Sequence, residues 1–177
     1  MHGEAVPPPA TALRTRRGAV LRAECAGDEA FVFRLFAEAR ALVFAQVPLA
    51  PAQRDALLRQ QFKLQTAHYR HSYPAASFSI VEWDGVAIGR ACVDRSEPCL
   101  RVVDLALLRQ WQGRGIGSRF LAGLLEEAGA AGRAVSLHVE RENPAQGLYL
   151  RLGFRVIRDT GVYLQMEWRP APEERAA

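Results

Sequence analysis

The stretch RQWQGRGIGS, Arg109 to Ser118, spaces three glycines at alternate positions between an apolar segment and a helical pattern. The preceding segment, VVDLALL at residues 102–108, is typical of a buried strand. The pattern that follows repeats apolar residues on one helical face: Ile116, Phe120, Leu121, Leu124 and Leu125. Glycine permits backbone geometries that side chains forbid and lets a ligand approach the main chain. The stretch therefore predicts a strand, a tight turn and a helix whose first amides can bind an anion.

Two common phosphate-binding loops do not fit this turn. A Walker loop needs glycine and lysine before its serine or threonine, whereas Gly117 and Ser118 have no lysine nearby. The dinucleotide pattern G-x-G-x-x-G, begun at Gly113 or Gly115, would need a third glycine where Ser118 or Phe120 stands. A third pattern, Gln/Arg-x-x-Gly-x-Gly, is met by residues 112–117.

The first half of the chain predicts a strand, two helices and a hairpin. A strand at residues 19–23 precedes a helix with Asp28 as its N-cap. The helix would bury Phe31, Leu35, Phe36, Ala39 and Val43. A second helix runs from Ala52 to the polar and aromatic residues before Pro74. Asp84 and Gly85 then join strands 77–83 and 86–93 in a two-residue turn, so this part of the sheet is antiparallel.

The second half alternates strand and helix. The strand at residues 100–107 leads through the glycine turn to a helix that Gly129 or Gly132 can end. The next strand, 134–140, must then lie parallel to it, because a helix connects the two. A short helix at 143–152 and strands at 155–157 and 162–168 follow. We expect one α/β domain with a mixed sheet over residues 19–169, between a disordered leader (1–18) and a disordered tail (170–177).

Composition restricts the class of protein. A chain of 177 residues with 49% hydrophobic residues can form one domain with a substantial core. The net charge of +4 comes from scattered basic residues, which does not favour a nucleic-acid partner. Cys25, Cys92 and Cys99 lack metal-ligand spacing, and no segment is apolar enough for a membrane span or a signal peptide. We expect a cytoplasmic protein without a metal or a membrane partner.

Two motifs together resemble those of the GNAT superfamily of N-acetyltransferases. The first is Gln112 to Gly117, which resembles the superfamily's acetyl-CoA loop; the second is Asn143 to Phe154, an asparagine, a short helix, Leu-Tyr and Gly-Phe. The resemblance covers nearly all of residues 19–168. It implies a mixed, mostly antiparallel central sheet that splays in a V between two parallel strands, with helices on its faces. One departure is Arg109-Gln110, where many members have a proline-containing turn.

The resemblance also implies how acetyl-CoA, the cosubstrate, is bound. Main-chain amides would hold its pyrophosphate, contributed by Gln112, Gly113, Arg114, Gly115, Ile116, Gly117 and Ser118. Its pantetheine arm would pair like a strand with Leu105, Ala106 and Leu107. The Leu107 N–H would donate to the developing oxyanion. Tyr149 would stand near the sulfur and donate a proton to it. Asn143 would either contact the cofactor or cap the helix that starts at Pro144.

The general base is left open between two residues of one strand and a water relay. His138 and Glu140 face one way along residues 134–140, and Val135, Leu137 and Val139 face the other. Some superfamily members carry a glutamate where His138 stands, and histidine accepts a proton near neutral pH. Asp104 is a carboxylate in an otherwise apolar strand and needs a partner, for which Arg101 is one option. We predict that Asp104 instead contacts His138, fixes its tautomer and raises its pKa.

Acetyl transfer to the primary amine of a small molecule, amino acid or peptide is the predicted function. The attack would be direct, so that no metal and no protein nucleophile is needed. The acceptor would be selected by the first two helices, in particular by His68, Tyr69, Arg70, His71 and Tyr73. The alternative is a catalytically silent sensor domain that binds CoA. A homodimer is compatible with either function.

Overall fold

The structure, a computed structural model, describes residues 18–96 and 98–171, with the side chain of Leu42 excepted. The expected leader, apart from Gly18, and the last six residues of the tail lie outside the described part. The secondary structure runs in the order β1 (Ala19–Ala23), the 3-10 helix η1 (Ala26–Asp28), α1 (Glu29–Ala45), α2 (Pro51–Ser72), β2 (Ser77–Trp83), β3 (Val86–Asp94), β4 (Leu100–Leu107), the 3-10 helix η2 (Arg109–Trp111), α3 (Ile116–Ala130), β5 (Val135–Glu140), α4 (Gln146–Arg151), β6 (Arg155–Asp159) and β7 (Tyr163–Trp168).

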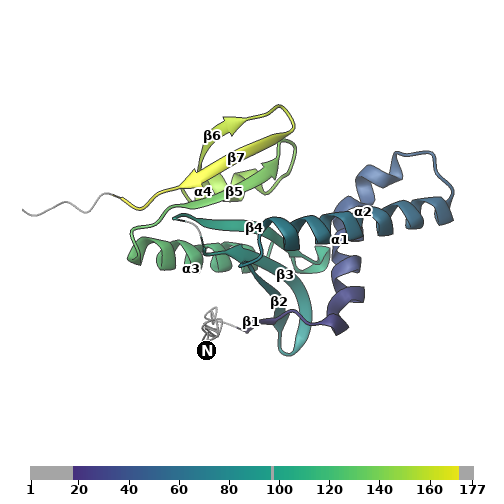
Figure 1. The fold of residues 1–177 in the computed structure, drawn as a ribbon, viewed down its shortest axis with the longest axis horizontal. Coiled ribbons are helices and arrows are strands. Elements are labelled where there is room, and N and C mark those ends of the chain that lie inside the picture. The colour runs from purple at the N-terminus through teal and green to yellow at the C-terminus, as the bar shows by residue number, and fades with distance from the viewer. Residues whose placement is uncertain (1–17, 97, 172–177) are drawn as a thin grey trace, which may run out of the picture.

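All strands belong to one seven-stranded sheet in the order β1-β2-β3-β4-β5-β7-β6. Only β4 and β5 pair in parallel, and every other neighbouring pair is antiparallel. Figure 1 shows the long helix α2 extending beyond the sheet. Helix α3 lies on the side of the molecule opposite the free end of α2. The predicted mixed, mostly antiparallel sheet is confirmed. Within the described residues, no helix has both the length and the hydrophobicity needed to cross a bilayer.

Left-handed backbone geometry appears where the sequence predicts turns. Asp84 and Gly85 both have positive φ angles, 49° and 76°, which a two-residue hairpin turn with a right-handed twist requires. At the end of α3, Gly132 has a φ of 63° and the Arg133 N–H donates to the Ala128 carbonyl at 2.8 Å. This bond closes the last turn of the helix, so that Gly132 rather than Gly129 is the terminating glycine.

Two apolar clusters hold the helices to the sheet. The larger one joins α3 and α4 to the sheet, with fully buried Leu121, Leu124 and Leu137 at its centre. The smaller one joins α1 and α2 to β2. In it the centre of the Phe62 ring lies 5.4 Å from that of Phe33 and 5.5 Å from that of Phe36, both in edge-to-face contact. Helices therefore cover the sheet on both faces, and α1 and α2 build the layer opposite α3.

Two local predictions are wrong, and a third holds for position only. Asp28 is the N-cap residue of α1, but its side chain makes no capping bond to that helix, because its carboxylate accepts from Arg22 and from the Cys25 N–H. Val43 is 64% exposed and Phe44 is buried, because the buried stripe of α1 follows positions 32, 36 and 44. The short helix α4 begins at Gln146 instead of Pro144, since the Asn143 side chain shapes a turn before it.

Candidate active site

The sheet opens between β4 and β5. β4 pairs with β3 from Arg101 to Leu107 but with β5 only from Leu100 to Val102. Figure 1 shows the two strands separating beyond this short ladder. The Leu108 N–H donates to the Ile88 carbonyl of β3 at 2.9 Å, and backbone groups alternate along an antiparallel ladder. The N–H groups of Leu105 and Leu107 therefore point away from β3, into the opening.

A β-bulge decides which side chains face each helical layer. Cys92 pairs with Asp104 and Val93 with Val102, so Val103 has no cross-strand partner of its own. Val102 lies in the core against α3, and beyond the bulge Leu105 and Leu107 pack against that same core. Asp104 consequently turns to the layer of α1 and α2, where it lines a cavity.

The glycine turn after β4 needs glycine at two of its three positions. Gly113 and Gly115 have φ angles of 72° and 73°, in the left-handed region that side chains disfavour, whereas Gly117 does not. The first bond of α3 runs from the Arg119 N–H to the Gly115 carbonyl at 3.0 Å. The amides of Ile116, Gly117 and Ser118 therefore have no acceptor within the helix and lie at its positive end.

Side chains fix this turn to the rest of the site. The Gln112 amide donates to the Leu107 carbonyl at 2.9 Å, so the turn folds back on the end of β4. The Arg119 guanidinium donates to the Arg114 carbonyl at 3.3 Å, and the Glu38 carboxylate of α1 accepts the Arg109 N–H at 3.3 Å. The sequence has no proline-containing turn after β4. The short 3-10 helix η2 leads from β4 into the glycine turn instead.

Tyr149 lies on α4, and only 8% of its surface is exposed. Its ring contacts Phe154 edge to face at 5.7 Å, and the described part of the chain offers its hydroxyl no hydrogen-bond partner. Burial raises the pKa of this phenol, and the negative charge of Asp104 raises it further. Tyr149 therefore keeps its proton at neutral pH.

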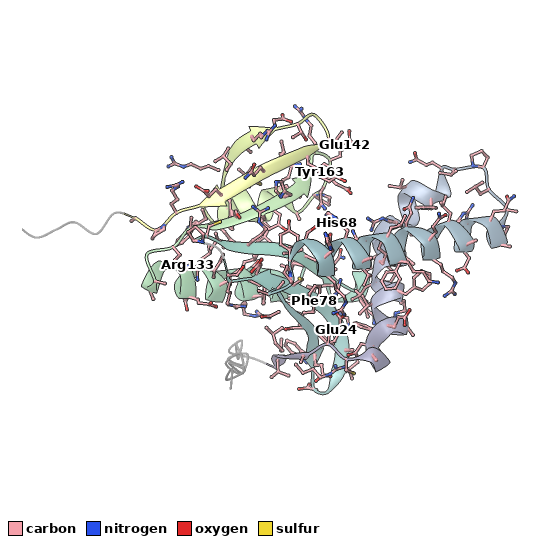
Figure 2. The ribbon with its side chains drawn as sticks, in the orientation of Figure 1. Glu24, His68, Phe78, Arg133, Glu142 and Tyr163 are labelled. Atoms are coloured by element: carbon pink, nitrogen blue, oxygen red, sulfur yellow. The ribbon has the colours of Figure 1, made fainter. Side chains whose placement is uncertain are left out.

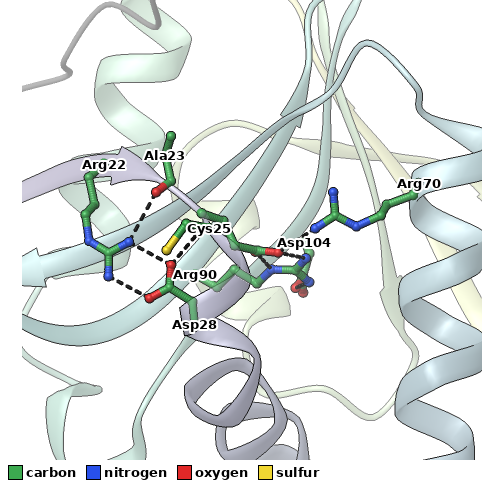
Figure 3. Close-up of polar contacts among 8 residues, drawn as sticks. Arg22, Ala23, Cys25, Asp28, Arg70, Arg90 and Asp104 are labelled. Atoms are coloured by element: carbon green, nitrogen blue, oxygen red, sulfur yellow. Dashed lines mark hydrogen bonds and ion pairs between the residues drawn. The ribbon is translucent and has the colours of Figure 1, made fainter.

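Asp104 belongs to a chain of ion pairs at the α1 and α2 face of the sheet (Figure 3). The Arg90 side chain is 4% exposed, and its guanidinium donates to Glu24 at 2.7 Å and reaches Asp104 at 3.4 Å. Arg70 of α2 also donates to Glu24, at 2.8 Å. Burial raises the pKa of Asp104, and Arg90 offsets part of that effect. Arg90, not Arg101, is the partner of this carboxylate.

The predicted contact between Asp104 and His138 is wrong. His138 lies on the exposed face of β5, with Nδ1 3.3 Å from the Arg101 guanidinium, and Asp104 pairs with Arg90 instead. Burial and the positive charge of Arg101 lower the pKa of His138, where the prediction was a rise. The reason is the opening itself: the ladder between the strands ends at Val102 and Leu137, just before the two residues would meet. Glu140 is exposed at the end of β5.

The aromatic and basic residues at the end of α2 lie partly toward the ion pairs and partly toward the solvent. Tyr69 and Arg70 face the ion pairs: burial and the charge of Asp104 raise the pKa of Tyr69, and Arg70 lies 4.7 Å over the Phe78 ring. His68 is exposed, with its ring 3.3 Å from Ser72, and Figure 2 shows it on α2 at the end near the sheet. His71 is exposed too. Tyr73 lies 5.9 Å from the Arg101 guanidinium.

Sequence reasoning missed Glu24 and Arg90. Arg90 is the one charged residue in the segment VAIGRACV at 86–93, and that pattern could have marked it. Glu24 carried no comparable signal, because its partner lies 66 positions away. For Asn143, the side chain accepts the Ala145 N–H at 2.9 Å, and a contact with a cofactor stays a prediction. Among the described residues, no His, Cys, Asp and Glu side chains gather as a metal site would require.

Two hollows lie beside the ion pairs. A cavity of about 60 Å³ is lined by residues of α1, α2, β3 and β4, with Asp104 and Ala106 in its wall. A larger groove of about 570 Å³ lies between the start of α1 and the second half of α2, with Glu24, Glu29 and Lys63 among its lining. Val32, Phe62 and Arg90 belong to both walls, so the two hollows adjoin.

Comparison with known protein families identifies a match over most of the chain. The family described as the acetyltransferase (GNAT) family matches residues 44–154. This range contains β4, the glycine turn, α3 and Tyr149. A search of curated protein sequences finds no match.

Comparison with solved structures finds the same fold in several acetyltransferases. The PaiA N-acetyltransferase of Thermoplasma acidophilum, in complex with coenzyme A, is 18% identical with a TM-score of 0.64, covering 85% of this chain and 98% of that one. A Corynebacterium glutamicum structure titled histone acetyltransferase HPA2 and related acetyltransferase is 22% identical, with a TM-score of 0.62 and coverage of 87% and 97%. RimL, a ribosomal L7/L12 alpha-N-protein acetyltransferase in complex with coenzyme A, is 16% identical, with a TM-score of 0.60 and coverage of 90% and 98%.

Proposed function

Because the chain belongs to the acetyltransferase (GNAT) family, we propose that it transfers the acetyl group of acetyl-CoA to a primary amine by direct attack on the thioester. The observation that carries this proposal is the open edge of β4, which leads directly into the glycine turn and the first amides of α3. A small-molecule, amino-acid or peptide amine is the acceptor. We place the reaction in the cytoplasm, without a nucleic-acid or membrane partner, and the free thiols of Cys25, Cys92 and Cys99 support a reducing compartment.

The residues of the opening fit acetyl-CoA. Leu105 and Leu107 offer backbone groups to a strand-like pantetheine arm, with Ala106 paired to β3 between them. The turn from Gln112 to Ser118 presents amides without helical acceptors to a pyrophosphate, at the positive end of α3. When bound there, acetyl-CoA supplies an acyl group on a thiol leaving group.

The residues around the opening supply the proton transfers. Asp104 accepts a proton from the acceptor ammonium and releases it to solvent. The Leu107 N–H donates to the thioester oxygen as negative charge develops there. The Tyr149 hydroxyl gives its proton to the departing sulfur and regains one from the acceptor nitrogen. In balance, a C–N bond forms, the C–S bond breaks and one proton is released. His138 and Glu140 are the alternative bases, acting from the exposed face of β5.

Release of free thiol from acetyl-CoA across a panel of primary amines tests the proposal. An enzyme releases thiol with at least one acceptor well above the rate of hydrolysis without an amine. A sensor domain binds acetyl-CoA in calorimetry and releases no thiol with any amine. Tyr149 favours the enzyme, because a buried phenol with an unshared hydroxyl is suited to proton donation.

A further inference from the structure

The cavity beside Asp104 combines opposite charges with an apolar wall. Its wall contains Asp104 and Ala106 from β4, Phe62 and Gln65 from α2, and Val32, Phe36 and Arg40 from α1. The sheet thus contributes the negative charge of Asp104 and the positive charge of its partner Arg90, and the helical layer contributes the positive charge of Arg40. The volume, about 60 Å³, is far below the roughly 300–1,000 Å³ of pockets for drug-sized ligands, so it has room for a small head group only.

Arg40 faces the cavity because it continues the buried stripe of α1. Positions 32, 36, 40 and 44 follow one another by one helical turn, and Val32, Phe36 and Phe44 are buried. The Arg40 guanidinium lies 3.9 Å from the centre of the Phe36 ring. Within the described residues it has no carboxylate partner, whereas Arg70 and Arg90 share Glu24. Arg40 therefore keeps its donors for another anion.

The hydrogen-bonding capacity of the Asp104 carboxylate is also only partly used. Its one hydrogen bond or ion pair in the described part of the chain joins Oδ2 to Arg90 at 3.4 Å, and 28% of the side chain is exposed. The positive charge of Arg40 acts on Asp104, which agrees with the two residues lining one cavity. The carboxylate can thus accept hydrogen bonds from an ammonium at the floor of the cavity.

We propose that this cavity selects an acceptor that carries a carboxylate beside its amine, that is, a free amino acid. Asp104 binds the ammonium next to the opening of the sheet. Arg40 binds the carboxylate, for which its planar donors are suited. Val32 and Phe36 contact the carbon atoms between the two charges. The inference rests on the proposed function, and the transfer is the one balanced above.

Paired acceptors test the selection. The twenty common L-amino acids and their L-amino acid amides are compared, since each amide keeps the amine and loses the negative charge. The comparison uses kcat/KM calculated for the free amine, because the two amines differ in pKa. We expect at least one amino acid to exceed its amide by about 100-fold, because a site built to bind a polar group rejects an analogue that leaves the site's own groups unpaired.

Arg40→Gln identifies the residue responsible. We expect it to raise the KM of that amino acid at least about 30-fold, to change kcat little and to abolish the preference over the amide. Arg40→Lys should restore part of the affinity. Arg34→Gln is the matched control: Arg34 lies on the same helix beside Phe31 and pairs with Glu38, outside the cavity wall. Thermal melts of all three variants show whether the fold is kept.

Calorimetry gives a second readout that needs no turnover. The CoA-bound protein is titrated with the preferred amino acid, or with glycine and alanine where no acceptor turns over. Binding that Arg40→Gln abolishes supports the inference, even if thiol release, and with it the proposed function, fails. The inference is overturned if the amino acid amides are acetylated as well as the amino acids, or if Arg40→Gln keeps the preference for the amino acid. Either result leaves the proposed acetylation of amines in place. Absence of amino-acid binding overturns it as well.

Discussion

At the scale of single residues, the proposed acid and the proposed base come from two different elements. Tyr149 comes from α4 and Asp104 from β4, and the charge of Asp104 contributes to the raised pKa of the phenol. Burial raises the pKa of both groups. A carboxylate with a raised pKa is a better base, and a phenol that stays protonated can act as an acid. The opposite roles proposed for them follow from their ordinary pKa values.

Tyr149→Phe tests the acid. We expect kcat to fall about 100-fold, because the hydroxyl acts as the sulfur departs, a typical size for general acid catalysis. The affinity for CoA should change less than about twofold, since the ring still packs against Phe154. Steady-state kinetics give the first quantity and calorimetry the second. Equal losses of kcat and of CoA affinity would show that Tyr149 serves only in packing.

Asp104→Asn and His138→Ala together identify the base. A base works only when deprotonated, so kcat/KM falls as the pH drops through its pKa. For Asp104 that pKa lies above the ordinary value of 3.8, and for His138 below the ordinary 6.5. We expect Asp104→Asn to lower kcat/KM about 100-fold and to remove the acidic limb of the pH profile. His138→Ala should leave that limb in place; its disappearance would make His138 the base.

At the scale of elements, the glycine turn joins β4 to α3, and a pair of matched glycines tests its role. Gly115 and Gly132 have φ angles of 73° and 63°, so alanine strains the backbone at both by about 1 kcal/mol. Only Gly115 lies where the phosphates would bind. We expect Gly115→Ala to weaken CoA binding at least about tenfold and Gly132→Ala to leave it unchanged, as measured by calorimetry. Equal CoA affinities of the two variants would show that the turn does not bind the cofactor.

The elements themselves follow closely from local sequence. The hairpin at Asp84 and Gly85, the strand before the glycine turn and the end of α3 at Gly132 depend on neighbours in the chain, and they were predictable. The ion pairs were not, because Glu24 and Arg90 lie far apart in sequence. Nor was the bulge at Val103, which turns Asp104 away from the α3 core and decides what the carboxylate contacts.

At the scale of the whole molecule, the sheet consists of two parts. Strands β1 to β4 carry α1 and α2, strands β5 to β7 carry α4, and the ladder between the parts spans only Leu100 to Val102. Helix α3 packs across both parts, since its cluster includes Val102 and Leu137. A wedge-shaped opening is thereby held apart by a continuous core on one face. A ligand in the opening would contact both parts and stabilise the folded state by mass action.

Amide hydrogen exchange, followed residue by residue by NMR, tests this arrangement. The amides of Ala106 and Leu108 are bound to β3, so they should exchange slowly with and without CoA. Those of Leu105 and Leu107 point into the opening and should exchange fast in the free protein. Saturating CoA should slow these two at least about tenfold, together with the amides at the start of α3, while β6, at the far edge of the sheet, stays unchanged. Added protection at Ala106 and Leu108 in place of their neighbours would show that the other edge of β4 faces the cofactor.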